Sequence, residues 1–245
     1  MTKPANLQIG TSGWNYEHWR NAFYDPNVPQ DQWLEYYSHR FPTVEINNSF
    51  YQLPRRRTLQ QWVRTVDDSF IFAVKASRYI THMKKLRESQ SAARKFLKRI
   101  DLLNSHVGPI LFQLPPHWRR NVERLERFLH MLPKDHRYTF EFRDKSWWAD
   151  DVYDLLQTHN AAFCVFDLKG ETSPKEVTAD FVYVRLHGPS HEAYKGHYGG
   201  QMLSGWAGAL HTWLSKGHHV FCYFDNDQNG YAPQDAMKLQ QMLSD

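Results

Sequence analysis

Acidic and basic side chains recur near the ends of separate apolar runs in this chain, a pattern typical of an acid–base site. Four of these residues can exchange protons with a substrate: Glu45, Lys75, Glu141 and Asp167. Burial and neighbouring cations can separate the pKa values of such carboxyl groups, so that one donates a proton while another accepts one. We therefore take these four as candidate catalytic residues. Lys75 also suits the role of ion-pair partner to Glu45, which we favour over that of a base or Schiff-base amine.

Further polar and aromatic residues near the same positions are candidates for substrate binding. Arg143 lies two residues after Glu141 on one strand face, so its guanidinium would hold that carboxylate ionised or clamp an anionic group. Aromatic rings in such places stack on sugars or bases, or else pack as loop cores. For Trp19, Phe23 and Trp148 we favour packing. The binding candidates are Trp14, Asn47, Tyr51, Gln113, Arg143, Trp147, Arg185, His187, Tyr223 and Asp227.

One loop, residues 187–200, combines histidines with glycines, a composition that suits two other functions, metal binding and phosphate binding. His187, His191 and His197 are potential metal ligands, but Lys75, Arg143 and Arg185 would repel a divalent ion in the same ring of residues. We therefore expect no metal and no cofactor. The glycines and Arg185 suit a phosphate, although GPS and YGG are also ordinary turn sequences.

Eight strand-like runs would have to position these groups. They are residues 7–12, 43–49, 70–76, 109–114, 137–143, 162–168, 181–187 and 220–226. In seven of them one face is apolar, and polar or charged residues occupy the other face late in the run. A half-solvated antiparallel sheet would alternate too, but helix-like segments separate these runs. The pattern favours an α/β fold, a TIM-like (β/α)8 barrel whose polar residues converge at one mouth.

The segments between the runs complete this prediction. Helix-compatible apolar spacing occurs in residues 31–40, 58–66, 89–106, 122–132, 149–158, 202–216 and 232–243. Ser89 and Asn121 are expected N-caps, and Gly108 and Gly217 are expected stop signals. Residues 169–180 form a short connection, so the helix after the sixth strand is expected to be short or missing. Because such a barrel takes about 250 residues, we predict one domain over residues 1–245.

Composition and charge restrict the class of protein. A hydrophobic content of 41% with 15% aromatic residues predicts a large core and argues against disorder. The net charge of +4 is milder than that of a dedicated nucleic-acid binder, so basic clusters such as residues 94–99 are expected to decorate helix surfaces. Cys164 and Cys222 lie on apolar strand faces and are expected to be buried, reduced thiols. The first ten residues lack a secretory signal and no apolar run could span a bilayer, so we expect a cytoplasmic protein without membrane contacts.

Several blocks occur in order along the chain and together resemble a known family. They are GTSGW (10–14), EIN (45–47), SFY (49–51), LP (53–54), TH (81–82), GPILFQLPP (108–116), EFR (141–143), SW (146–147), YVRLHG (183–188) and YFDND (223–227), with Phe72 and Lys75 between them. This combination resembles the YecE-like family, domain of unknown function 72, over residues 9–239. The resemblance implies a one-domain TIM-like barrel and supplies no reaction. Asp225 and Asp144 stand where the family pattern has Asn and His, which weighs against catalysis by these two carboxylates, whereas Asp227 fits the pattern.

Three hypotheses follow from these features. We favour an enzyme of hydrolase type, with its reaction class open. It would use carboxylate acid–base chemistry and Arg or Lys anion contacts on a small polar or anionic substrate. Such a substrate would be a sugar, sugar phosphate or nucleotide-like molecule. The alternatives are a metal-dependent phosphoesterase acting on nucleic acid and a non-catalytic nucleic-acid- or protein-binding module. On the favoured hypothesis, Glu141→Gln or Arg185→Met should leave the fold soluble while abolishing ligand binding or turnover.

Overall fold

The computed structural model describes residues 6–244, and its strands confirm the eight predicted runs. They are β1 (Leu7–Thr11), β2 (Thr43–Ile46), β3 (Ile71–Lys75), β4 (Val107–Leu114), β5 (Tyr138–Phe142), β6 (Ala162–Leu168), β8 (Phe181–Leu186) and β9 (His219–Phe224). A further strand of two residues, β7 (Glu171–Thr172), pairs antiparallel with β6. Apart from β7, hydrogen-bonded neighbours follow the order β1-β9-β8-β6-β5-β4-β3-β2.

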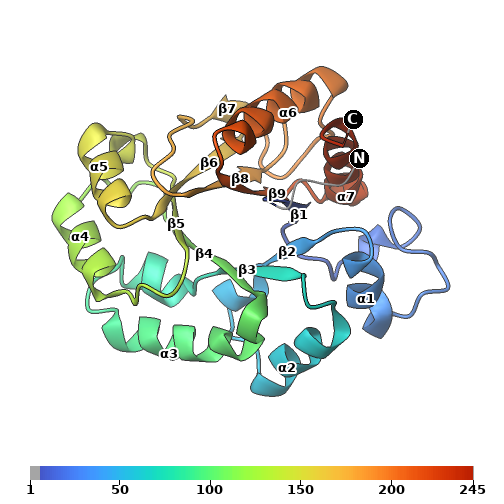
Figure 1. Cartoon of the computed structure of the whole chain (residues 1–245), viewed down its shortest axis with the longest axis horizontal. Coiled ribbons are helices and arrows are strands. Elements are labelled where there is room, and N and C mark those ends of the chain that lie inside the picture. Colours follow the sequence, from blue (N-terminus) through green and yellow to red (C-terminus); the bar gives the residue numbers. More distant parts are fainter. Residues whose placement is uncertain (1–5, 245) are drawn as a thin grey trace. The chain divides into compact units, whose positions relative to one another are not determined.

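Parallel pairing and intervening helices identify the fold class. The pairs β1–β9, β8–β9, β3–β4, β4–β5 and β5–β6 all run parallel. An isolated parallel bridge between Ser12 and Glu45 joins the ends of β1 and β2, which stand first and last in the strand order. Parallel neighbours need long connections, and helices supply them here (Figure 1). The predicted TIM-like (β/α)8 fold is thereby confirmed.

The predicted helices form, with altered ends. They are α1 (Trp33–Ser38), α2 (Arg56–Thr65), α3 (Gln90–Ile100), α4 (Val122–Met131), α5 (Asp150–Thr158), α6 (Gly200–Ser215) and α7 (Tyr231–Met242). Short helical turns accompany them: η1 (Glu17–Trp19), η2 (Gln30–Gln32), η3 (Asn48–Phe50), η4 (Tyr79–Met83, a π-helix), η5 (Asp101–His106), η6 (Lys145–Trp147) and η7 (Gln228–Gly230). Residues 169–180 contain β7 and no helix, so the expected short or missing helix after the sixth strand is confirmed.

Asn121, Gly217 and Ser89 lie at the predicted helix ends, Ser89 without a side-chain cap, and the prediction for Gly108 is wrong. The Asn121 side chain accepts a hydrogen bond from Arg124 N (2.9 Å), and Gly217 follows α6 with φ +86°. Ser89 occupies the N-cap position of α3, but its hydroxyl donates to Arg87 O and leaves the helix amides uncapped. Gly108 lies inside β4, because α3 gives way to η5 and Asn104 interrupts that turn with φ +53°.

The chain forms two compact units. Unit 1 comprises the described residues up to Glu45, Val165–Lys175 and the residues from Phe181 onward, and unit 2 comprises Ile46–Cys164 and Glu176–Asp180. The prediction of a single domain over residues 1–245 stays a prediction. So does the expected lack of a secretory signal, which also concerns residues 1–5, outside the described part. Of the residues that are described, no helix is both long and apolar enough to cross a membrane.

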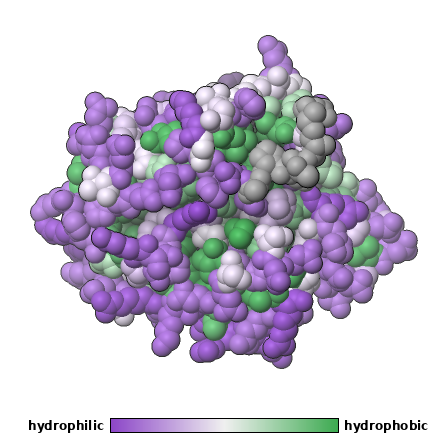
Figure 2. Space-filling view, in the orientation of Figure 1, coloured by the Kyte–Doolittle hydropathy of each residue, from purple (hydrophilic) through white to green (hydrophobic). Residues whose placement is uncertain are grey.

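Aromatic packing builds much of the core. In unit 1 the Tyr24 and Trp33 rings stack with centroids 4.5 Å apart, and Trp19 and Phe23 pack beside them as predicted. Cys164 and Cys222 are buried free thiols, as predicted, and burial raises the pKa of Cys222. Hydrophilic residues dominate the face drawn in Figure 2, interrupted by smaller hydrophobic areas.

Candidate functional site

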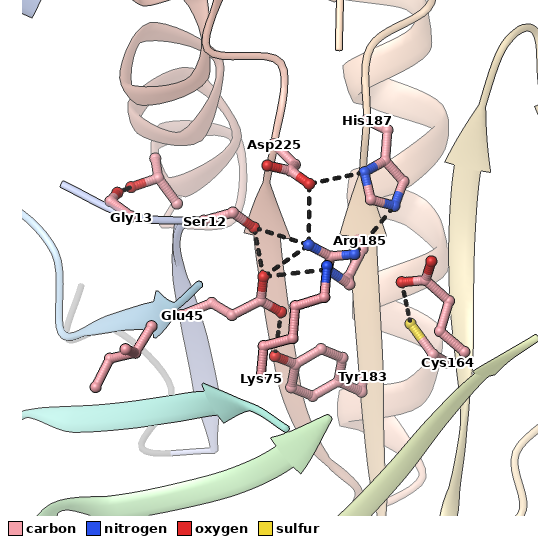
Figure 3. A network of polar contacts seen from close by, with 12 residues as sticks. Ser12, Gly13, Glu45, Lys75, Cys164, Tyr183, Arg185, His187 and Asp225 are labelled. Carbon is pink, nitrogen blue, oxygen red and sulfur yellow. Dashed lines mark hydrogen bonds and ion pairs between the residues drawn. The ribbon is translucent and has the colours of Figure 1, made fainter. Parts of the chain in front are cut away.

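Arg185 is the centre of a buried polar cluster in unit 1. Side chains of Tyr183, Arg185 and His187 alternate onto one face of β8 and its extension, because successive strand residues point to opposite faces. The Arg185 side chain is 0% exposed, and its Nη2 donates to Glu45 Oε1 (2.8 Å) and to Asp225 Oδ2 (2.9 Å) (Figure 3). We call Ser12, Glu45, Tyr183, Arg185, His187 and Asp225 the Arg185 cluster.

The Glu45 carboxylate is held through both of its oxygens. Ser12 Oγ donates to Oε1 (2.7 Å), which Arg185 Nε also approaches (3.2 Å). The Tyr183 hydroxyl donates to Oε2 (2.6 Å), and burial, followed by the Glu45 charge, raises the pKa of Tyr183 well above its usual range. Tyr183 therefore stays a hydrogen-bond donor, and Glu45 is fully buried with four donor contacts.

Hydrogen bonds also define the tautomer of His187. Its Nε2 lies 3.4 Å from Arg185 Nη1, and its Nδ1 lies 3.0 Å from Asp225 Oδ2. Arginine can only donate, so Nε2 is the acceptor and the ring proton sits on Nδ1. That N–H donates to Asp225, which thus receives one donor from the guanidinium and one from the imidazole. Both interactions stabilise the ionised carboxylate of Asp225.

Asp227 lies two residues farther along the chain in a different setting. Its side chain is 28% exposed, and His18 Nε2 approaches Oδ2 (3.7 Å) and the backbone oxygen (2.7 Å). Burial, and after it the charge of Asp225, raises the pKa of Asp227. Tyr16, from the loop after β1, donates its hydroxyl to Ser12 O (2.8 Å). The segment after β9 thus places two carboxyls in different surroundings: Asp225 accepts from Arg185 and His187, whereas the pKa of Asp227 is raised.

Asp167, at the end of β6, is a third carboxyl of unit 1. It is buried, and its Oδ2 accepts a hydrogen bond from the Tyr198 hydroxyl (3.2 Å). Burial raises the pKa of Asp167 above its usual range. The Tyr198 hydroxyl in turn accepts from Gly188 N (3.0 Å), which ties the loop after β8 to this carboxyl.

The raised pKa of Asp167 predicts a pH-dependent gain in stability for Asp167→Asn. A carboxyl whose folded-state pKa is raised stabilises the fold fully below its unfolded pKa, and this contribution is lost as pH rises through the folded-state value. The amide carries no charge and can still accept from Tyr198. We expect the variant to exceed the wild type in free energy of unfolding by about 0.5–2 kcal/mol at pH 7, with the difference shrinking toward about pH 4. Urea denaturation at several pH values measures this, and a difference independent of pH would contradict it; Asp68→Asn, at an exposed turn, is the control.

Unit 2 carries a polar cluster around Glu141. Arg143 Nε donates to Glu141 Oε1, so the two residues form the ion pair that their spacing predicted. Cys164 Sγ donates to Glu141 Oε2 (3.8 Å). The Glu141 side chain is fully buried, while Arg143 retains slight exposure. We call Lys75, His82, Glu141, Arg143 and Cys164 the Glu141 cluster.

His82 belongs to this cluster through its electrostatics. Burial, followed by the charges of Lys75 and Arg78, lowers its pKa to about 4, so its imidazole is neutral at pH 7. Its Nδ1 lies 2.9 Å from Thr81 Oγ1, and its ring meets Phe50 edge-on at 5.0 Å. The Lys75 ammonium lies 4.5 Å from the centroid of the same Phe50 ring.

The other predicted binding residues differ in accessibility. Tyr51 is 75% exposed, whereas Trp147 is buried, stacks on Phe142 at 4.9 Å and donates its Nε1–H to Trp118 O. Trp14 is also buried, and the buried Tyr223 hydroxyl contacts Thr43 Oγ1 (2.7 Å). Gln113 Nε2 donates to Leu114 O (3.3 Å), while the side-chain oxygen of Asn47 has no hydrogen-bond partner among the described residues.

The loop histidines have separate partners. His187 contacts Asp225, His197 Nδ1 lies 2.7 Å from Asp235 Oδ1, and His191 lies under Gly170. Across residues 6–244, no three His, Cys, Asp or Glu side chains gather in a way that would hold a metal ion. Asp144 accepts from Ser146 N (3.0 Å) as the cap of η6, and this hydrogen bonding lowers its pKa.

The predicted site residues divide between the two units. Glu45, Asp167, Arg185, His187, Tyr223, Asp227 and Trp14 belong to unit 1, and Asn47, Tyr51, Lys75, Gln113, Glu141, Arg143 and Trp147 belong to unit 2. Sequence reasoning missed Ser12, Tyr183 and His82 as site residues and weighed against Asp225, although all four lie inside the sequence blocks named above. Tyr183 carried a usable signal, because it alternates with Arg185 on one strand face.

Comparisons with known proteins agree with this fold. The family profile "Protein of unknown function DUF72" matches residues 8–245. UPF0759 protein YunF of Bacillus subtilis (strain 168) is 26% identical over 270 residues, which cover 97% of this chain and 94% of YunF. The crystal structure of a DUF72 family protein from Thermotoga maritima MSB8 is similar with a TM-score of 0.88 and 27% identity, covering 98% of this chain and 99% of that one. A DUF72 family protein from Enterococcus faecalis V583, 19% identical with a TM-score of 0.84 over 97% of this chain and 95% of that one, shows the same fold. The chain therefore belongs to the DUF72 family, as its sequence blocks predicted.

Proposed function

We propose that this protein is a hydrolase-type enzyme that acts on an uncharged polyhydroxyl substrate, such as a sugar, at the end of β9 in unit 1. Asp225 is the ionised carboxylate that activates the attacking hydroxyl group or water, and Asp227 is the proton donor to the leaving group. The observation that carries this proposal is the contrast between these two carboxyls. Asp225 receives hydrogen bonds from Arg185 and His187, whereas the pKa of Asp227 is raised.

Glu45 and Arg185 have positioning roles in this proposal. Both side chains are fully buried, and the donors of Arg185 already serve two carboxylates. Arg185 holds Asp225 in place, and Glu45 balances the charge of Arg185 while Ser12 and Tyr183 fix its orientation. This assignment replaces direct catalysis by Glu45 with an indirect contribution through Asp225.

The charge balance of the cluster favours a neutral substrate over an anionic one. Glu45 and Asp225 supply two negative charges and Arg185 supplies one positive charge, while Asp227 would add negative charge when it ionises. Within the Arg185 cluster a phosphate group would meet two carboxylates, and the guanidinium of Arg185 is already engaged by both of them. Sugar hydroxyls, which both donate and accept, suit such a site better.

A substrate comparison tests the proposal. The purified protein is incubated with neutral nitrophenyl glycosides and, in parallel, with nitrophenyl phosphate, and the released nitrophenol is measured against pH. We expect release from a glycoside, with a rate that falls as pH rises through the raised pKa of Asp227, because the proton donor is lost. Hydrolysis of the phosphate but of no glycoside would refute the assignment of a neutral substrate.

Nucleic-acid binding is a second candidate, because unit 2 exposes aromatic rings beside basic residues. Tyr51 and Tyr79 are both exposed; the Tyr51 ring contacts that of Phe50, which in turn contacts His82, and Tyr79 begins the η4 turn that contains His82. The exposed cations nearby in sequence are Arg55, Arg56, Arg57 and Arg78. Exposed rings with cations are the means by which proteins bind single strands, through stacking on bases and phosphate contacts.

Fluorescence anisotropy with a labelled single-stranded oligonucleotide tests the second candidate. We expect affinity to fall steeply with salt and Tyr51→Ala to weaken binding by about 1–3 kcal/mol. Tyr153→Phe, at a position outside this surface, is the control. An affinity for the oligonucleotide that changes neither with salt concentration nor in Tyr51→Ala would exclude this function for the surface.

A further inference from the structure

A cavity of about 500 Å³ lies in unit 2 at the N-terminal end of β5, the opposite end of that strand from Glu141. Its walls come from the C-terminal ends of α4 and α5 and from the segment that leads into β5. Figure 1 shows α4 and α5 side by side next to β5. The volume is within the range of small-molecule sites. None of the residues discussed under the proposed function lines this cavity.

The Tyr138 hydroxyl is the cavity's most informative group. Tyr138 is 6% exposed, and its hydroxyl has no hydrogen-bond partner among residues 6–244. Burial, followed by the charges of Asp135 and Asp101, raises the pKa of Tyr138, so the group remains a neutral phenol that can donate. Buried polar groups in folded proteins nearly always have a partner, so a ligand acceptor at this position would complete the site.

The charges around the cavity define the ligand's charge. Its lining contains Lys134 and three histidines, His130, His136 and His159, and no carboxylate. Burial, and then His130, lowers the pKa of His159, which is therefore neutral at pH 7. His130 faces Glu126 at 3.9 Å, and His136 faces Asp101 at 3.3 Å and Asp135 at 3.8 Å, so nearby carboxylates offset any charge on these two rings. Lys134 is the one ammonium group in the lining, and because the charges of Asp101 and Asp135 also reach Tyr138, the site matches a monoanion better than a phosphate dianion.

Apolar side chains form the rest of the wall. Leu129, Leu132 and Pro133 line the cavity, and both leucines are almost fully buried. The apolar part of a ligand would pack against these side chains, and its removal from water would favour binding. We propose that this cavity binds a small monocarboxylate with an apolar body, whose carboxylate accepts from the Tyr138 hydroxyl and lies beside Lys134.

Isothermal titration of the full chain with benzoate, benzamide and inorganic phosphate tests this site. Benzoate is expected to bind one to one and at least about tenfold more tightly than benzamide, its uncharged counterpart. Tyr138→Phe removes only the hydroxyl and should weaken benzoate binding about tenfold. Lys134→Gln, at an exposed position that does not threaten folding, should abolish the preference for benzoate over benzamide. Tyr153→Phe is the matched control, because Tyr153 lies outside the cavity, and it should bind like the wild type.

Three outcomes would overturn the proposal. They are the absence of one-to-one benzoate binding at about 10 mM, unchanged benzoate affinity in both Tyr138→Phe and Lys134→Gln, and tighter binding of phosphate than of benzoate. Because the glycoside assay concerns unit 1, this result is independent of the proposed hydrolase.

Discussion

Arg185→Met should lower the free energy of unfolding at pH 7 by about 3–5 kcal/mol. The substitution preserves much of the side chain's apolar volume but removes the guanidinium between Glu45 and Asp225. The Glu45 carboxylate is 0% exposed, so it would remain buried without its cation. Urea denaturation followed by circular dichroism measures the loss. The sequence alone predicted that this variant keeps a soluble fold. Because the Arg185–Glu45 pair is buried, we now expect the variant to lose a large part of the stability of a typical domain.

The chain offers a matched control for this prediction. Arg127 pairs with Glu123 on α4, and both side chains are 73% exposed, so Arg127→Met should change stability by no more than about 1 kcal/mol. Combining Arg185→Met with Glu45→Gln should recover part of the loss, because the double variant has no buried charge at residue 45. Equal effects of Arg185→Met and Arg127→Met would show that the buried cluster contributes no more than a surface pair.

Asp227→Asn should reduce kcat on the glycoside that the wild type cleaves by about 10²–10⁴-fold. An amide cannot donate the proton that the leaving group needs, while the geometry around residue 227 is retained. The folded-state pKa of Asp227 is raised, so its carboxyl destabilises the fold once pH exceeds that value, and the variant should be somewhat more stable at pH 7. Loss of activity together with a higher melting temperature separates a catalytic role from structural damage.

Two comparisons make this prediction specific. An activated leaving group such as nitrophenol needs less protonation, so the loss should be smaller for nitrophenyl glycosides than for a disaccharide with the same sugar. Asp68→Asn, at an exposed turn of unit 2, should leave kcat unchanged. If Asp227→Asn retained full activity on both substrates, Asp227 would not be the proton donor.

Local sequence patterns predicted the fold and several short-range contacts. Alternation along the strands identified the fold, and the two-residue spacing of Glu141 and Arg143 predicted their ion pair. Asn121 was recognisable as a cap because a cap acts on residues three positions away. Ser89 has the same suitable residue type, yet its hydroxyl bonds backward to Arg87 O, a choice that residue type alone does not determine.

Local patterns could not predict which residues, distant in sequence, would contact the site residues. Tyr183 and Glu45 are 138 positions apart in sequence, and their hydrogen bond forms because the fold brings these two residues of unit 1 together. Family pattern weighed against Asp225, but the contacts from Arg185 and His187 make it the best-anchored carboxylate near Asp227. The environment that raises the pKa of Asp227 likewise arises from packing, which residue spacing does not encode.

The two buried thiols have a practical consequence for experiments. Thiol-reactive probes attack exposed thiolates, and Cys164 and Cys222 are both inaccessible. A cysteine introduced on the surface would therefore be labelled selectively without replacing either native residue. Ala193 is a suitable position, because the adjacent Tyr194 ring lies 5.5 Å from that of His187, and a fluorophore there would report on occupancy of the neighbouring site.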